Sequence, residues 1–189
     1  MELLITLVIV GVLLTVGLPA LKTFTQGSQL VASTNELLSA IHIARSEAVK
    51  SNARVTICSS SDGTSCSGST NWRDGWIVFV AVTGDLVGAA AACTAAGGDC
   101  LLRVHDAFTD NLLSVSGVDT GAVAISSFTF SSRGLPTVGG VSRAGAFSIC
   151  SFDASNTVIG SRAVVLSLAG RVRISDNAAV ISCPASPPV

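Results

Sequence analysis

An uncharged stretch of 19 residues near the N-terminus limits what this chain can fold into more than any other feature: residues 3–21 read LLITLVIVGVLLTVGLPAL. As an α-helix this stretch would measure about 28 Å, close to the hydrocarbon thickness of a bilayer. A cleaved signal peptide is the competing interpretation, but it requires basic residues in front and a small-residue cleavage site behind. Here Glu2 stands in front and a helical pattern follows, so residues 1–21 are predicted to form a membrane-spanning helix.

The same helix is predicted to continue to about Asn52 as an amphipathic segment. Beyond residue 21 the apolar positions recur with the period of about 3.6 residues that one buried helical face requires. Pro19 interrupts the pattern, because proline removes a backbone hydrogen bond and clashes with the preceding turn, so we predict a kink or a melted stretch there. The recurring apolar positions are Leu30, Leu37, Ile41, Ala44 and Ala48.

Three charged residues of this helix need an explanation, and for Glu2 there are two. Glu2 is either an interfacial acid that complements the helix dipole or the partner of a positive group on another subunit, since a lone charge in lipid is costly. Arg45 and Glu47 lie off the apolar stripe. We expect these two at the boundary between the helix and the rest of the protein, where they contribute packing and charge pairing.

From Val55 onward the pattern changes to short apolar segments separated by glycine, serine and asparagine, which is typical of β-strands. The Ala/Gly-rich segment 87–99 is expected to be a loop insertion, with a short alanine-rich helix as the alternative. Trp72 and Trp76 are expected to belong to the core or its rim, the alternative being a platform for a glycan or another ligand. Strands are predicted at residues 55–58, 75–80, 101–104, 127–132, 146–152, 163–168 and 171–174.

These patterns predict an α+β fold in three segments. Residues 1–21 form the apolar helical segment, residues 22–54 the amphipathic second half of the same helix, and residues 55–189 a β-rich head. The second half of the helix is expected to pack on antiparallel sheets, because its apolar stripe needs a buried partner.

The six cysteines indicate disulfide bonds in an oxidising compartment such as the periplasm. They allow 15 pairings, and free thiols are the other alternative. Cys58–Cys66 and Cys93–Cys100 would each close a short loop, which leaves Cys150 to pair with Cys183. No two cysteines form a CxxC motif and the chain has two histidines, so no zinc site is expected.

Composition and motifs argue against catalysis. The formal net charge of −1 provides no overall attraction to nucleic acid or to anionic lipid. The sequence holds no GxSxG, HExxH or P-loop pattern. His105 and Asp106 are adjacent, but neighbours on a strand point to opposite faces, and His42 is expected to be solvated or at an interface. We therefore predict no enzymatic activity, no metal, no cofactor and no small-molecule substrate.

One cluster has recognisable chemistry, the segment GRVR at residues 170–173. On a strand, Arg171 and Arg173 project from the same face about 6.6 Å apart, while Val172 takes the other face. The forked donors of arginine suit phosphate groups. The alternative is that the two arginines mark a solvated sheet edge and discourage the addition of a further strand.

Glu2 at the front of the apolar helix, and Pro19 about 17 residues later, resemble the start of type IV pilins and type II secretion pseudopilins. Later fragments resemble the FimT/GspH type of that family, in the same order along the chain. They are ARSEA (44–48), CSSSDGTSC (58–66), WRDGWIVF (72–79), FTFSSRG (128–134), SIC (148–150) and GRVR (170–173).

The resemblance implies a pilin fold and partners that are other pilin subunits in a helical filament, with Glu2 and Pro19 acting in assembly. It implies a single-pass protein of the bacterial inner membrane with its head in the periplasm, found later in an extracellular pilus or a periplasmic pseudopilus. The expected function is that of a minor pilin that helps filament initiation or assembly. The alternative is a type II secretion pseudopilin of the GspH type.

The resemblance also supplies a candidate ligand for the GRVR segment. In FimT-type pilins a motif of this form is associated with DNA binding during natural transformation, so Gly170–Arg173 is a candidate DNA site.

The resemblance departs at the start of the chain. Family members normally carry four residues before the glutamate after processing, whereas Met1 alone precedes Glu2, and we expect the printed sequence to differ there from the natural start.

Overall fold

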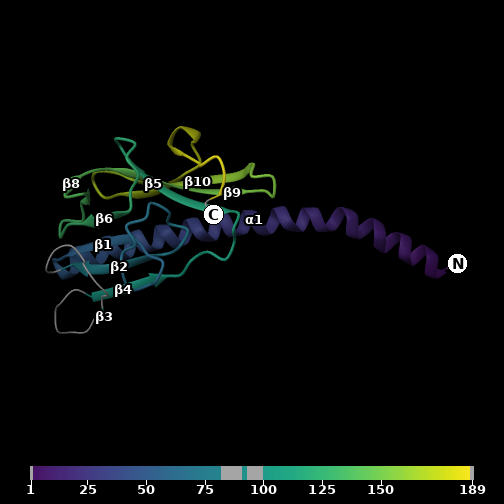
Figure 1. Cartoon of the computed structure of the whole chain (residues 1–189), viewed down its shortest axis with the longest axis horizontal. Coiled ribbons are helices and arrows are strands. Elements are labelled where there is room, and N and C mark those ends of the chain that lie inside the picture. Colours follow the sequence, from purple (N-terminus) through teal and green to yellow (C-terminus); the bar gives the residue numbers. More distant parts are fainter. Residues whose placement is uncertain (1, 82–90, 93–99, 188–189) are drawn as a thin grey trace.

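The structure, a computed structural model, describes residues 2–81, 91–92 and 100–187, without the side chains at positions 14, 16–20, 22–23 and 91–92. One long helix, α1 (Glu2–Ser51), carries a head of two β-sheets around its second half. The first half of α1 extends away from the head (Figure 1). The predicted α+β architecture, with a helix packed on antiparallel sheets, is confirmed.

The apolar stripe of α1 explains where the head begins. All five predicted positions, from Leu30 to Ala48, are buried in one core cluster with residues of both sheets. Leucine and isoleucine fill this face, while Ala44 and Ala48 allow the sheets to approach the helix closely. The position of the stripe therefore fixes which half of the helix is enclosed.

The first sheet has seven strands in the order β3-β4-β2-β1-β6-β7-β8. Its pairings are antiparallel except that between the short β3 and β4, which is parallel. The strands are β1 (Arg54–Ser59), β2 (Trp76–Ala81), β3 (Ala91–Ala92), β4 (Cys100–His105), β6 (Ser127–Phe130), β7 (Pro136–Val138) and β8 (Val141–Ser142).

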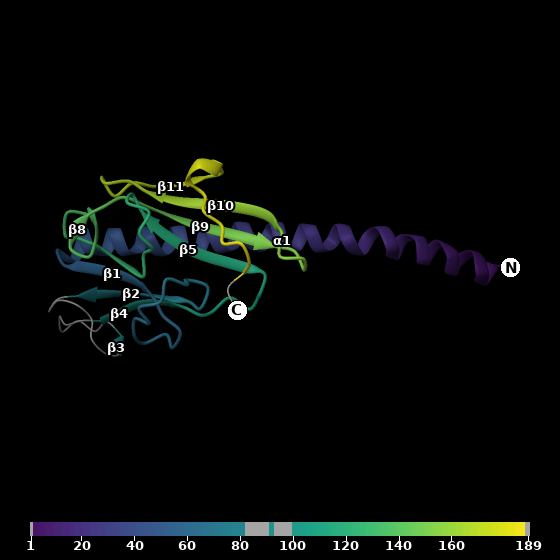
Figure 2. The same ribbon diagram turned by 45° about the horizontal axis from the view of Figure 1, so that its top comes forward.

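The second sheet has four antiparallel strands in the order β11-β10-β9-β5. The two sheets lie on opposite sides of the second half of α1 (Figures 1 and 2). A short 3-10 helix, η1 (Ala178–Val180), follows the last strand. The strands are β5 (Leu113–Asp119), β9 (Gly145–Phe152), β10 (Val158–Leu166) and β11 (Val172–Ser175).

Each predicted strand has an observed counterpart, whereas β5 and the short strands β3, β7 and β8 were not predicted. The sequence of β5, LSVSGVD, contains small polar residues and a glycine that resemble turn signals. Gly117 is required there because a Cβ at that position would lie 2.6 Å from the ring of Phe147. The predicted insertion 87–99 lies outside the described residues except for β3 and its two alanines.

The predicted melted stretch at Pro19 is wrong, because α1 is continuous from Glu2 to Ser51. The free half of the helix curves gradually in place of a sharp kink (Figure 1). A proline removes one backbone hydrogen bond, and the helix on both sides of it is long enough to absorb that loss as a bend.

Candidate functional site

Two turns with the same hydrogen-bond pattern meet at the end of the head that is remote from the N-terminus of α1 (Figure 2). One joins β6 to β7 at residues 131–135, and the other joins β10 to β11 at residues 167–171. In each turn the first and last residues pair through a backbone hydrogen bond, which leaves three loop residues, 132–134 and 168–170. The last loop residue is a glycine in the left-handed region, with φ of +72° at Gly134 and +73° at Gly170. In each, the glycine N–H donates to a serine carbonyl at 2.8 Å.

Arg45 of α1 joins these two turns. Its Nε donates to the carbonyl oxygen of Gly134 at 3.2 Å, and its Nη2 donates to the carbonyl oxygen of Ala169 at 3.3 Å. Because one turn belongs to each sheet, a single guanidinium ties the helix to both sheets. Sequence reasoning placed Arg45 at the boundary between helix and head but missed this bridge.

The two glycines allow the turns to touch. A Cβ on residue 170 would lie 2.1 Å from the carbonyl oxygen of Gly134 and 2.9 Å from Nε of Arg45. Real Cβ atoms do not approach a backbone oxygen so closely, so a side chain at this position would push the turns apart. The glycine of the GRVR segment thus serves a packing contact between the sheets.

The candidate DNA-binding residues lie directly beside this contact. Arg171 ends the β10–β11 turn, and Arg173 lies in β11, which is an edge strand that begins one residue later than predicted. Both side chains are exposed, and neither has a hydrogen bond or ion pair with another described residue. Arg133, next to Gly134, is exposed as well.

Two other arginines in this half of the chain form ion pairs with aspartates. Arg162 Nε lies 3.7 Å from Oδ1 of Asp176, and Arg143 Nη1 lies 2.7 Å from Oδ2 of Asp119. Asp119 also accepts hydrogen bonds from the N–H groups of Val123 and Gly121. The backbone donors, led by that of Val123, and the Arg143 charge hold the pKa of Asp119 below its usual range.

The predicted assembly residues lie on the free half of α1. Glu2 is exposed in the first helical turn, and Pro19 lies within the continuous helix. Leu3 is 78% exposed and Phe24 is 72% exposed, and the large apolar residues described between them are also exposed. In the part of the chain that the structure describes, no helix is both long and apolar enough to span a membrane.

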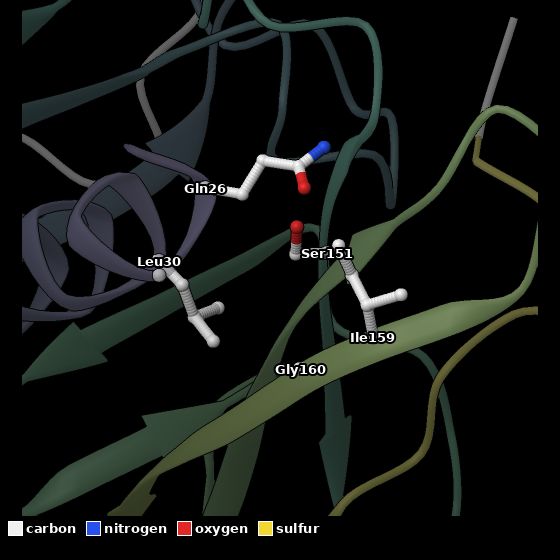
Figure 3. A pocket seen from close by; sticks show the side chains of 6 residues that line it. Gln26, Leu30, Ser151, Ile159 and Gly160 are labelled. Atoms are coloured by element: carbon white, nitrogen blue, oxygen red, sulfur yellow. The ribbon is translucent and has the colours of Figure 1, made fainter. Parts of the chain in front are cut away.

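A small pocket marks the neck where α1 enters the head (Figure 3). It holds about 110 Å³ between the helix and the β9–β10 hairpin. Gly160 makes room for the helix there, because a Cβ on it would lie 3.0 Å from Cδ2 of Leu30. The lining residues are Gln26, Gly27, Leu30, Ser151, Ile159 and Gly160.

Comparison with known proteins identifies the family. Residues 33–170 match the family described as Type II transport protein GspH, which covers well over half of the chain. The chain belongs to the GspH family. The matched region contains Arg45 and both turn glycines, and it ends immediately before Arg171. The expected FimT/FimU/GspH type of pilin-like protein is thereby confirmed.

Two crystal structures of the type IV minor pilin FimU from Pseudomonas aeruginosa PAO1 are similar to this GspH-family protein. The first, in space group P21, has 24% sequence identity and a TM-score of 0.49, covering 80% of this chain and 92% of that chain. The second, in space group P65, has 25% identity and a TM-score of 0.47, covering 76% and 90%. No curated protein matches the sequence significantly.

Two disulfides brace the head of this GspH-family protein in its described part. Cys58 pairs with Cys66, and Cys150 pairs with Cys183, with Cα–Cα separations of 5.6 and 5.9 Å. Both are pairs that the sequence favoured. The third favoured pair, Cys93–Cys100, includes Cys93, which lies outside the described residues.

The remaining candidates have structural roles. Trp72 and Trp76 are buried, as predicted for core residues, and Trp72 Nε1 donates to the carbonyl oxygen of Ile125 at 2.7 Å. His105 stacks on Trp76 with ring centroids 3.8 Å apart, and its Nε2 lies 2.9 Å from Oε2 of Glu36. GspH-family proteins are structural subunits of pilin type, and such subunits are not enzymes.

Proposed function

We propose that this GspH-family protein is a minor subunit of a type IV pilus that helps the filament to start or assemble. Before assembly, the apolar half of α1 lies in the bacterial inner membrane with the head in the periplasm. In the filament, the same half packs among the helices of other pilin subunits. The exposed apolar side chains that the structure describes between Leu3 and Phe24 carry this proposal, because so much apolar surface requires a nonaqueous environment.

Glu2 has a specific part in this proposal. It is the one charge at the front of the apolar stretch, and a charge among apolar helices is costly unless a positive group neutralises it. We assign it to a positive group on the neighbouring subunit. We assign Pro19 to the gradual curvature of the free half of the helix, which packing among neighbouring helices uses.

The test replaces Glu2 in the full-length subunit and measures incorporation into filaments. Glu2→Ala should give a folded subunit that reaches the membrane and enters filaments poorly. Glu47→Ala is the control, since Glu47 is an acid of the same helix that pairs with Lys50 at 3.5 Å outside the apolar half. Normal incorporation of Glu2→Ala would contradict the pairing.

The alternative is a pseudopilin of a type II secretion system, which the description of the matched family favours. The two functions separate in a strain that lacks the gene. Loss of surface pili with intact protein secretion supports the pilus subunit. Loss of secretion with intact pili supports the pseudopilin.

A second function, capture of DNA, is favoured by the state of Arg171 and Arg173. Both are exposed and unpaired among the described residues, and they lie on an edge strand where a duplex has access. The competing role is a charged sheet edge that discourages strand addition. Contacts of this kind reach phosphates and carry no sequence information.

The full chain in detergent should therefore bind duplexes of unrelated sequence with similar affinity, more weakly as salt rises. The double variant Arg171→Gln/Arg173→Gln should lose this binding and keep the melting temperature of the parent. If the double variant and the parent bind DNA equally, Arg171 and Arg173 serve only as a charged sheet edge.

A further inference from the structure

Arg133 and Arg171 are 38 positions apart in the chain, yet their backbones lie at one corner of the head. Each is the direct neighbour of a glycine, and the backbone of Gly134 touches that of Gly170. Because consecutive Cα atoms are 3.8 Å apart, both arginines begin within one residue of this contact. The bridge from Arg45 to the two turns holds them in this arrangement.

The charge of Arg133 is available to a ligand. Its side chain is exposed, and no described residue forms an ion pair or hydrogen bond with it. Arg143 and Arg162 are neutralised by Asp119 and Asp176. The unpaired guanidiniums at this corner therefore come from both sheets, with Arg133 from one and Arg171 and Arg173 from the other.

We infer that Arg133 is a third phosphate-binding residue of the site formed by Arg171 and Arg173. The inference rests on the proposed DNA-binding function, and it extends the proposed site from the sheet that holds Arg171 and Arg173 to the other sheet. The phosphate backbone of a nucleic-acid strand crosses the seam between the two sheets, with Arg133 on one side and Arg171 on the other. Arginine suits this task because its charge persists at every physiological pH and its forked donors match phosphate oxygens.

The salt dependence of DNA binding counts such contacts. The logarithm of the binding constant falls with the logarithm of salt concentration by about 0.9 per phosphate neutralised. Three contacts therefore predict a loss of affinity of about 40-fold between 50 and 200 mM salt, and two contacts predict a loss of about 12-fold. Removing one arginine should change the slope by a measurable step.

The experiment measures binding of a fluorescent 20-base-pair duplex to the full chain in detergent across this salt range. The variants are Arg133→Gln, Arg171→Gln and Arg103→Gln. Arg103 is the matched control, an exposed arginine on β4, which β2 and β1 separate from β6 in the same sheet. Thermal unfolding of each variant checks the fold, and vesicles rich in phosphatidylglycerol replace the duplex in a parallel series.

The inference holds if Arg133→Gln and Arg171→Gln both reduce the salt-dependent loss to about 12-fold, while Arg103→Gln keeps that of the parent. It is overturned, with DNA binding intact, if Arg171→Gln lowers the slope and Arg133→Gln behaves like Arg103→Gln. A parent that binds no duplex overturns the proposed DNA function itself. The same holds if the parent binds vesicles and no duplex, and a loss of vesicle binding in Arg133→Gln and Arg171→Gln but not in Arg103→Gln then assigns the corner to a lipid surface.

Discussion

Nε of Arg45 lies 3.2 Å from the carbonyl oxygen of Gly134, which is 89 positions further along the chain. The same guanidinium reaches Ala169 in the second sheet at 3.3 Å, 124 positions away from Arg45. Two fragments that each resemble the pilin family, ARSEA and FTFSSRG, therefore meet at this contact, and GRVR adjoins it through Gly170, which lies against the carbonyl oxygen of Gly134. The contact holds the helix and both sheets together at the end of the head.

Replacing Arg45 should destabilise the head. A hydrogen bond from a charged donor contributes roughly 1.5–3 kcal/mol, and the part-buried bond to Gly134 should contribute more than the exposed bond to Ala169, so Arg45→Ala should cost about 2–4 kcal/mol. For a chain of this size, that predicts a melting temperature lower by about 4–16 °C. Arg45→Lys should fall between Arg45→Ala and the parent, because an ammonium cannot reproduce the planar fork. Arg103→Ala is the control, and equal melting of the Arg45→Ala and Arg103→Ala variants would refute the bridge.

Gly170→Ala should be more harmful than the same change at a free glycine. Both Gly170 and Gly140 are left-handed, with φ of +73° and +79°, so each substitution costs about 1–2 kcal/mol from backbone strain. At Gly140 a Cβ meets nothing within 4 Å, whereas at Gly170 it meets the oxygen of Gly134 at 2.1 Å. Thermal unfolding of the two variants isolates the cost of this overlap. Equal destabilisation would mean that the turns do not touch.

Asp119 should contribute to acid sensitivity of the fold. Its folded pKa is lowered, chiefly by the N–H of Val123, below the unfolded value of about 3.9. Its stabilisation is therefore present above pH ~4 and is lost as pH falls through the folded pKa. Asp62, whose pKa is lowered by the Ser65 hydroxyl and nearby N–H groups, acts in the same direction.

Asp119→Asn should therefore flatten part of the acid limb in a plot of melting temperature against pH. The variant should differ from the parent most at neutral pH and least at about pH 2, because the parent carboxylate is increasingly protonated there. A constant difference between the two proteins across this range would show that Asp119 acts through packing alone.

The Cys150–Cys183 disulfide should stabilise the head more than the Cys58–Cys66 disulfide. By chain entropy, closing a loop with a sequence separation of 33 contributes about 3.7 kcal/mol, and a separation of 8 contributes about 2.5 kcal/mol. The longer loop also holds the segment after η1, where the Ser182 N–H donates to Ser148 Oγ at 2.8 Å. Thermal unfolding of the paired serine variants tests the order, and a larger loss at Cys58–Cys66 would reverse it.

The helix and most strands were predictable because their signals are local. The stripe from Leu30 to Ala48 has helical spacing, and the short apolar segments between turn residues predicted seven of the observed strands. The longest of the missed strands, β5, uses Gly117 to admit the ring of Phe147, a partner 30 positions away. From the sequence alone a glycine such as Gly117 indicates a turn. Its position in a strand is explained only by its contact with the ring of Phe147 in the folded protein.

The amino-acid order thus determined a long helix with one buried face, a β-rich head and two exposed arginines in GRVR. Local periodicity and side-chain chemistry are sufficient for each of these. Only the tertiary structure decided that Arg45 bridges Gly134 and Ala169, and that Arg133 stands beside the GRVR corner. These relationships depend on how two sheets close around a helix, and such closure is set by packing between residues that no local pattern connects.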